Sequence, residues 1–324
     1  MYNTTTFSIL FVMYTCTSSL YAVSTISNST ISLSEQEALS STTTFQAKRY
    51  PKDVRNDSQW RIIGGSDCHH TFMVTIFATK TSKQLGTGTL ISPKFVLTAA
   101  NCFVGLPFLE TVYVTVGRSN LESKSFRKIR VKWIQRISEY YSPEKVDLAL
   151  VFLRKAVVPR EGEISFIKLP EKTLENDLTN ICPSNVFTAA GWGNVKPDQA
   201  DINYTPQLKC ADIPYLNPNK CKSAVEYFHP ARQMCLLHPE GEKDTCFGDT
   251  GGPVFCNGIQ YGIISTTYHC GDPQKPRLVT RVDRHLDFIN PFIHFFKSGS
   301  LSKFRKCSHS NISFIASILL VFLH

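Results

Sequence analysis

Residues 23–61 contain no cysteine and no regular spacing of apolar side chains. The absence of cysteine excludes a disulfide-knotted recognition module in this part of the chain. The absence of apolar periodicity leaves no hydrophobic face whose burial could offset the entropy of ordering. What the segment does contain is mostly serine and threonine, as in STISNSTISLSEQEALSSTTT. This composition predicts a disordered pro-segment.

The C-terminal apolar tail, residues 312–323, is shorter than the roughly 20 residues that a membrane-spanning helix needs. It follows the small residues Ser298, Gly299 and Ser300 and the polar spacer LSKFRKCSHSN. A small site, a polar spacer and a short apolar tail together form the signal for a GPI anchor. Residues 298–324 are therefore predicted to be such a signal, which would attach the protein to a membrane. The alternative is an apolar extension on a secreted protein.

The N-terminus has an apolar stretch, FSILFVMYT at 7–15, but no lysine or arginine before it. Residues 1–22 are predicted to be a signal peptide, and an uncleaved anchor is the alternative. Eleven cysteines in a chain that begins in this way indicate an oxidising compartment. We therefore expect a secreted protein or one on the extracellular cell surface. Sequons at Asn28, Asn56 and Asn203 are candidate glycan sites.

The formal net charge of +9 is spread along the chain. Residues 62–300 carry 27 Lys and Arg against 22 Asp and Glu, residues 23–61 carry +1, and residues 301–324 carry +3. This distribution argues against a nucleic-acid partner. One basic pattern remains, the alternation of Lys128, Arg130 and Lys132 with apolar residues, which predicts a strand. Its basic side is either a solvated face or a patch for an anionic glycan or partner.

Five motifs follow one another along the chain: RIIGG at 61–65, LTAANC at 97–102, DLAL at 147–150, GWG at 191–193 and KDTCFGDTGGPVFC at 243–256. In this order they resemble the trypsin/chymotrypsin family of serine proteases, over residues 62–297. The resemblance implies an all-β fold of two six-stranded antiparallel β-barrels with a C-terminal helix. A chain of 324 residues with 42% hydrophobic content can bury a core of this size.

The three positions of the family's catalytic triad would be Asn101, Asp147 and Thr250, so histidine and serine are both replaced. In the family mechanism the imidazole accepts the proton of the serine hydroxyl, and the carboxylate orients the imidazole. An asparagine amide cannot accept that proton near neutral pH. Gly248 of the oxyanion loop remains. We hypothesise that the Asn101 side-chain NH₂ donates to Asp147 in place of the missing imidazole.

No replacement base is evident in the sequence, because the histidines nearest to the motifs stand elsewhere, at His69, His70, His229 and His238. The specificity pocket is altered as well. Asp244 resembles the floor carboxylate that makes trypsin-like relatives select Lys or Arg. Thr267 and Arg277 replace expected glycines, and Thr266 replaces a tryptophan. An Arg277 guanidinium beside Asp244 would form a bidentate pair and fill the pocket from inside; alternatively, Arg277 turns outward to solvent.

The activation apparatus is retained. Arg61 followed by Ile62 resembles a trypsin-type activation site, and Asp249 is the carboxylate that would receive the new amino terminus of Ile62. The chain is therefore expected to undergo the zymogen switch without catalysis, unless these residues are inherited without use. No metal or cofactor is expected. In particular, Arg118 stands near the place where relatives have the first acidic ligand of a calcium loop.

The resemblance also implies four disulfides: Cys68–Cys210, Cys221–Cys235, Cys246–Cys270 and Cys182–Cys256. Cys182 lies a few residues earlier than usual, with Phe187 at the expected position, so we expect a rearranged loop there. Gly86 stands where the usual partner of Cys102 would be, which predicts that Cys102 is a free buried thiol.

These observations predict a non-catalytic serine protease homologue that acts by binding a protein partner: a protease, an inhibitor or a receptor. A trypsin-like protease would be the activator at Arg61. One alternative is a weakly active trypsin-like endopeptidase that uses Thr250 with a recruited base. Another is a GPI-anchored adhesion protein in which the old cleft is only scaffold.

Overall fold

The computed structural model describes residues 62–79, 83–106, 112–137, 146–193, 206–265 and 270–298. The predicted signal peptide and pro-segment, the sequons and nearly all of the predicted anchor signal lie outside these residues. The chain divides into two units, Met1–Arg55 and Asn56–His324, and every described residue belongs to the second. Among the described helices, none combines the length and apolar character that crossing a bilayer requires.

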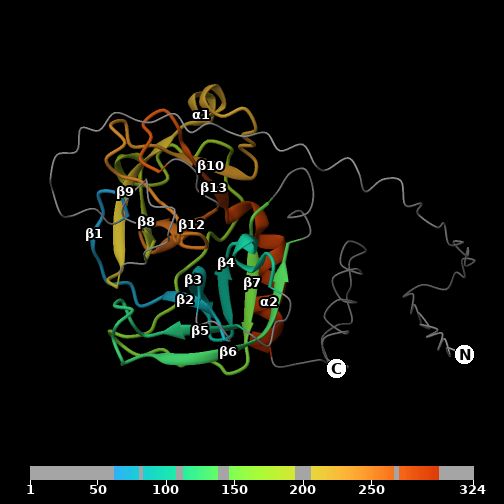
Figure 1. The fold of residues 1–324 in the computed structure, drawn as a ribbon. Coiled ribbons are helices and arrows are strands. Elements are labelled where there is room, and N and C mark those ends of the chain that lie inside the picture. The colour runs from blue at the N-terminus through green and yellow to red at the C-terminus, as the bar shows by residue number, and fades with distance from the viewer. Residues whose placement is uncertain are drawn as a thin grey trace, which may run out of the picture. The chain divides into compact units, whose positions relative to one another are not determined.

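The first half of the described chain forms a closed six-stranded β-barrel in the strand order β2-β3-β4-β7-β6-β5 (Figure 1). Its strands are β2 (Met73–Ala78), β3 (Gln84–Ser92), β4 (Phe95–Thr98), β5 (Val112–Val116), β6 (Arg127–Arg136) and β7 (Ala149–Leu153). All pairings are antiparallel. Closure leaves no free sheet edge in this barrel.

The second half, together with β1 from near the start of the described chain, forms a sheet in the order β1-β9-β10-β13-β12-β11-β8. The pairing of β8 with β9 closes this sheet into a second six-stranded barrel with β1 added. Its strands are β1 (Ser66–Asp67), β8 (Val186–Gly191), β9 (Lys209–Leu216), β10 (Gln233–Leu236), β11 (Pro253–Cys256), β12 (Ile259–Ile264) and β13 (Arg277–Arg281). The predicted fold class is confirmed.

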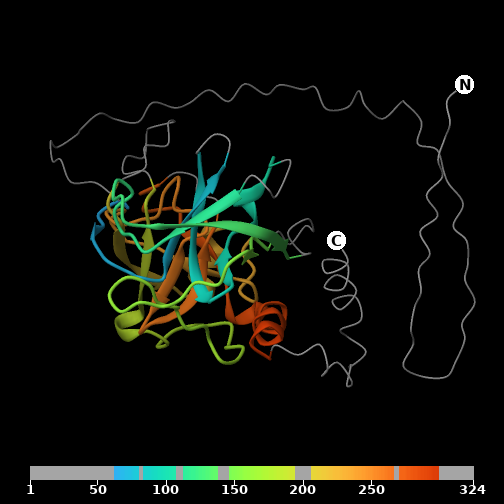
Figure 2. The same ribbon diagram turned by 90° about the horizontal axis from the view of Figure 1, so that it is seen from below.

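Among the described residues, five helical segments lie between or after the strands: η2 (Ala100–Phe103), η5 (Pro183–Asn185), α1 (Pro218–Ala224), η6 (Asp283–His285) and α2 (Leu286–Ser298). The C-terminal helix α2 covers the first barrel, because Phe292 packs 5.5 Å from Trp133 and 6.2 Å from Phe95, measured between ring centroids. Figure 1 and Figure 2 show α2 beside the strands of this barrel.

Strand β6 has the alternation that the sequence predicts. Ile129 and Val131 are buried in the barrel core, whereas Lys128, Arg130 and Lys132 are exposed on its outside.

The two barrels contact each other at Thr250. Its carbonyl oxygen accepts a hydrogen bond, 2.9 Å long, from the Thr87 N–H of β3.

Candidate functional site

Asp147 lies just before β7 and is buried, with 5% of its surface exposed. Its Oδ1 accepts the backbone N–H of Asn101 at 2.8 Å, and its Oδ2 accepts the Ser265 hydroxyl at 2.6 Å. Burial raises the pKa of Asp147, and these hydrogen bonds act in the opposite direction. The structure therefore brings the residues at the first two triad positions together around a buried carboxylate.

The hydrogen bond described between these two residues comes from the Asn101 backbone N–H. The predicted donation from the Asn101 side-chain NH₂ to the same carboxylate stays a prediction. The backbone of η2, which starts at Ala100, places that N–H on the carboxylate. Any residue other than proline at position 101 can make the same bond.

Thr250 lies in the loop before β11, opposite the first barrel. Its carbonyl oxygen accepts the Thr87 N–H and lies 3.5 Å from the Cys102 sulfur. Gly248, two residues earlier, has a φ of 97°, which glycine adopts readily and other residues rarely do. The predicted oxyanion-loop glycine thus stands at a backbone position that favours glycine.

Asp244 and Arg277 form a buried ion pair, and 6% and 7% of their surfaces are exposed. The Arg277 Nε lies 2.7 Å from Oδ1 and 2.8 Å from Oδ2, and its Nη2 lies 2.6 Å from Oδ2. The backbone N–H groups of Thr245 and Gly271 also donate to this carboxylate. The predicted contact is therefore present, and Arg277 does not turn outward. Thr266 and Thr267 lie outside the described residues.

All four predicted disulfides are present: Cys68–Cys210, Cys182–Cys256, Cys221–Cys235 and Cys246–Cys270. The rearranged loop beside Cys182 is also present. Ser184 and Asn185 have φ values of 52° and 55°, which turn the chain sharply so that Phe187 enters the core of the second barrel.

Cys102 is a free, buried thiol, as predicted, and burial raises its pKa to about 12. A Cβ atom at Gly86 would lie 2.4 Å from its sulfur, closer than nonbonded atoms can approach. Glycine at 86 is what leaves room for the thiol.

The family model described as Trypsin matches residues 62–289. The chain belongs to the trypsin family. Snake venom serine protease homolog 2A of Craspedocephalus gramineus is 32% identical over 242 residues, which cover 72% of this chain and 87% of that protein. Thrombin-like enzyme kangshuanmei of Gloydius brevicauda is 31% identical, with 72% and 96% covered. Glandular kallikrein of Sus scrofa is 30% identical, with 72% and 97% covered. These trypsin-family relatives bear the names of enzymes and of a protease homolog, so chemistry has to be argued from the site.

The segment that would follow the predicted activation cleavage packs into the second barrel. Ile62 is fully buried, and the Ile63 carbonyl oxygen accepts the Asp244 N–H at 3.1 Å. The φ of Ile62 is 27°, a strained value for a β-branched residue. Arg61, the predicted cleavage position, lies outside the described residues.

Asp249 is fully buried, and its oxygens accept the backbone N–H groups of Gly193 and Cys246 at 2.8 Å each. Burial raises its pKa to about 7. A Cβ at Gly193 would lie 2.6 Å from the Asp249 Cγ, and one at Gly191 would lie 2.1 Å from its Oδ1. Both glycines of the GWG motif are therefore explained by the close approach of this carboxylate.

Sequence reasoning missed Ser265, which donates to Asp147. Its only sequence signal is its place directly before Thr266, at the end of β12. It also missed the ion pair of Arg281 with Asp283, which is fully buried and in which Nη2 lies 2.8 Å from Oδ2. This pair holds backbone carbonyls around residues 175, 176 and 230 and serves the fold.

Proposed function

We propose that this trypsin-family chain is an extracellular protease homologue that does not hydrolyse peptide bonds and acts by binding a protein. The observation that carries the proposal is the place of Asn101, whose N–H lies 2.8 Å from the buried Asp147 carboxylate. A general base is needed beside that carboxylate, and an amide cannot serve as one. Neither can the other donor, the Ser265 hydroxyl, which donates a hydrogen bond to Asp147 and is too weakly basic to accept the proton.

The ion pair of Asp244 with Arg277 supports the proposal independently. A substrate lysine or arginine needs a carboxylate with free acceptor positions at the pocket floor. Here both oxygens of Asp244 already accept from Arg277, which also occupies space beside them. A competing substrate cation would have to displace a buried, multiply hydrogen-bonded guanidinium, which is costly.

We further propose that cleavage after Arg61 acts as a conformational switch in an otherwise non-catalytic protein. The support is the retained geometry around Asp249, a buried carboxylate held only by neutral backbone donors among its described hydrogen bonds. An amino terminus at Ile62 would bring a positive charge to a segment that is already buried. The relatives named as venom proteins support an extracellular location. We also propose that a GPI anchor attaches the protein to a membrane and that its partner is a protease, an inhibitor or a receptor.

The test is hydrolysis of arginyl and lysyl esters by the secreted protein after cleavage following Arg61. We expect no turnover above that of the Thr250→Ala variant. Turnover that Thr250→Ala abolishes would instead support a threonine nucleophile with a recruited base, and it would contradict the proposal.

A further inference from the structure

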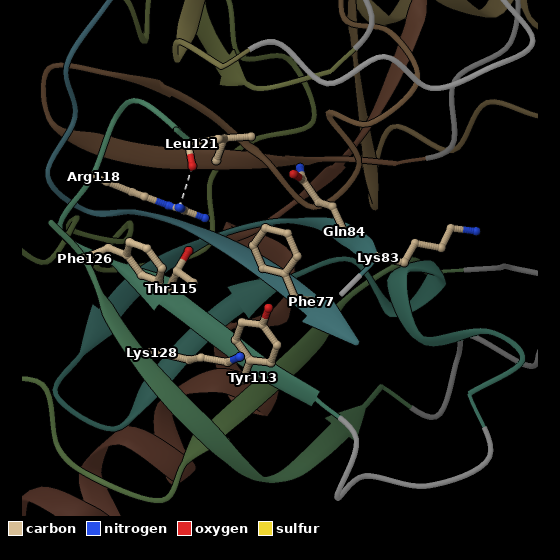
Figure 3. A pocket seen from close by; sticks show the side chains of 9 residues that line it. All are labelled: Phe77, Lys83, Gln84, Tyr113, Thr115, Arg118, Leu121, Phe126 and Lys128. Carbon is tan, nitrogen blue, oxygen red and sulfur yellow. Dashed lines mark hydrogen bonds between the residues drawn. The ribbon is translucent and has the colours of Figure 1, made fainter. Parts of the chain in front are cut away.

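A hollow of about 460 Å³ opens on the outside of the first barrel, over strands β2, β5 and β6. Figure 3 shows its side chains. Three are aromatic, Phe77, Tyr113 and Phe126, and three are cationic, Lys83, Arg118 and Lys128. This volume lies within the range of sites that accommodate small ligands or a few side chains. Its lining comes from the first barrel and not from the residues around Asp244.

Two of the three cations of the hollow, Arg118 and Lys128, are held over aromatic faces. The Arg118 guanidinium lies 4.2 Å from the centroid of Phe126 and 5.8 Å from that of Phe77, and the Lys128 Nζ lies 3.6 Å from that of Tyr113. Phe77 and Tyr113 stack on each other with centroids 5.4 Å apart. A hydrogen bond from Arg118 Nη1 to the Leu121 carbonyl oxygen, 2.7 Å long, fixes the guanidinium further, as Figure 3 shows.

The ring contacts position the charges of Arg118 and Lys128 without neutralising them. A ring face attracts a cation through its quadrupole but carries no net charge. None of the described residues that line the hollow is aspartate or glutamate. The hollow therefore combines a preorganised positive potential with an aromatic floor, and its complement is an anionic ligand that also has an apolar group.

We propose that the hollow binds an acidic peptide segment of a protein partner, with an aromatic side chain in the hollow and carboxylates on its cations. The inference deepens the proposed binding function and rests on it. Ester hydrolysis tests whether the site around Asp147 and Asp244 is catalytic, whereas peptide binding tests whether the hollow holds a partner. Either proposal can therefore fail without the other.

The register of the strands extends the site along β6. Lys128 pairs with Thr115 and Arg130 pairs with Tyr113 across the β5–β6 ladder, so both cations lie on the outer face with the floor of the hollow. Side chains two residues apart on a strand are spaced roughly 6.6 Å. An extended peptide has the same spacing, so carboxylates at every second residue match the cations of β6.

The aromatic lining favours a peptide over a sulfated glycan. A sulfated glycan would supply the negative charge, but it would offer Phe77, Tyr113 and Phe126 only the C–H faces of its sugar rings. An aromatic residue flanked by acidic ones satisfies both the rings and the cations, because aromatic pairs add to the area that they bury.

The test measures binding of a fluorescent peptide to the secreted full-length protein by fluorescence anisotropy. The peptide carries one phenylalanine followed by glutamates at every second position. Two control peptides replace the phenylalanine by alanine or the glutamates by glutamine. We expect both controls to bind at least several-fold more weakly, and we expect affinity to fall as salt is added.

Two protein variants and a matched control locate the site. Lys128→Glu reverses a charge in the hollow and should weaken binding about tenfold, and Phe126→Ala should weaken it several-fold. Lys220→Glu makes the same charge change on α1, which Figure 1 places at the other end of the unit from β5 and β6, and should leave affinity unchanged.

Equal losses in Lys128→Glu and Lys220→Glu would mean that only net charge matters and would overturn the proposal. So would affinity for a heparin oligosaccharide that exceeds affinity for the peptide and is unchanged by Phe126→Ala, because the ligand would then be a glycan. Failure of the peptide to bind at low ionic strength would also overturn it.

Discussion

The charged groups of the cleft, meaning the site around Asp147 and Asp244, have polar partners within the chain, whereas Arg118 and Lys128 of the hollow contact aromatic rings. In the cleft, Asp244 is paired with Arg277 within the chain, and Asp147 accepts two hydrogen bonds. In the hollow, Arg118 and Lys128 face rings, with no carboxylate among the described lining residues. A buried charge that has its partner within the chain serves the fold, whereas a cation fixed over a ring stays available to another molecule. On this basis we propose that the charges around Asp147 and Asp244 stabilise the fold and that the hollow is the recognition site.

The largest effect that would sharpen this comparison is expected from Arg277→Ala. Removing one member of a buried ion pair leaves Asp244 without its cation and should lower the free energy of unfolding by about 3 kcal/mol. Urea denaturation measures this. Benzamidine, a soluble cation, should restore part of the loss in Arg277→Ala and leave the unaltered protein unchanged. Equal stabilisation of both proteins by benzamidine would show that Asp244 is already accessible and would break the comparison.

The second expected effect is a pH dependence centred on Asp249. Its folded pKa of about 7 exceeds the ordinary aspartate value of 3.8, so the folded state binds the proton more tightly. The intact chain should therefore lose stability as pH rises from about 4 to about 7, by roughly 2 to 4 kcal/mol. Urea denaturation across this range measures the loss, and Asp249→Asn should remove most of it.

Cleavage after Arg61 should also remove most of this pH dependence, because the new ammonium group would favour the charged carboxylate. Identical pH profiles for the intact protein, the cleaved protein and Asp249→Asn would contradict the proposed switch.

A third, smaller effect separates the two donors on Asp147. Ser265→Ala leaves Oδ2 without the hydroxyl and should lower the free energy of unfolding by about 1 to 3 kcal/mol. Asn101→Ala retains the backbone N–H and should cost less than about 1 kcal/mol. Thermal and urea denaturation of the two variants measure the difference. A larger cost for Asn101→Ala would show that the side-chain amide is the more important donor.

The smallest effect is expected in the hollow. Lys128→Ala removes an exposed cation and leaves no buried charge without its partner. The free energy of unfolding should therefore change by less than about 0.5 kcal/mol. Urea denaturation checks this beside Arg277→Ala. A loss of 2 kcal/mol or more would mean that the cations of the hollow are structural too.

Sequence predicted the parts of the molecule that are encoded by local motifs and cysteine spacing. The two barrels, three of the four disulfides and the free Cys102 follow from motifs whose order and spacing are retained, and the Cys182–Cys256 disulfide forms although Cys182 is shifted along the chain. The contact of Arg277 with Asp244 follows from counting residues after Cys270. In each case one residue type at one position decides the outcome.

The hydrogen bonding of Asp147 and the lining of the hollow depend on strand register and on the path of the backbone. The residue types at single positions carry little information about either. The Asn101 N–H on Asp147 is set by the path of η2 and not by the identity of the side chain. The alternation of Lys128 and Arg130 predicts a strand, but not that Tyr113 and Phe77 lie beside it. The hollow lies over β2 and over the neighbouring strands β5 and β6, and the pairing of β2 with β5 that closes the barrel brings them together.

The most direct test of the catalytic account is a reversion series on the protein cleaved after Arg61, assayed by hydrolysis of arginyl esters. Asn101→His with Thr250→Ser restores the triad chemistry, and adding Arg277→Gly opens the pocket beside Asp244. The account predicts no turnover by the unaltered protein, little by the double variant and clear turnover by the triple variant. Turnover by the unaltered protein that equals that of the triple variant would contradict it.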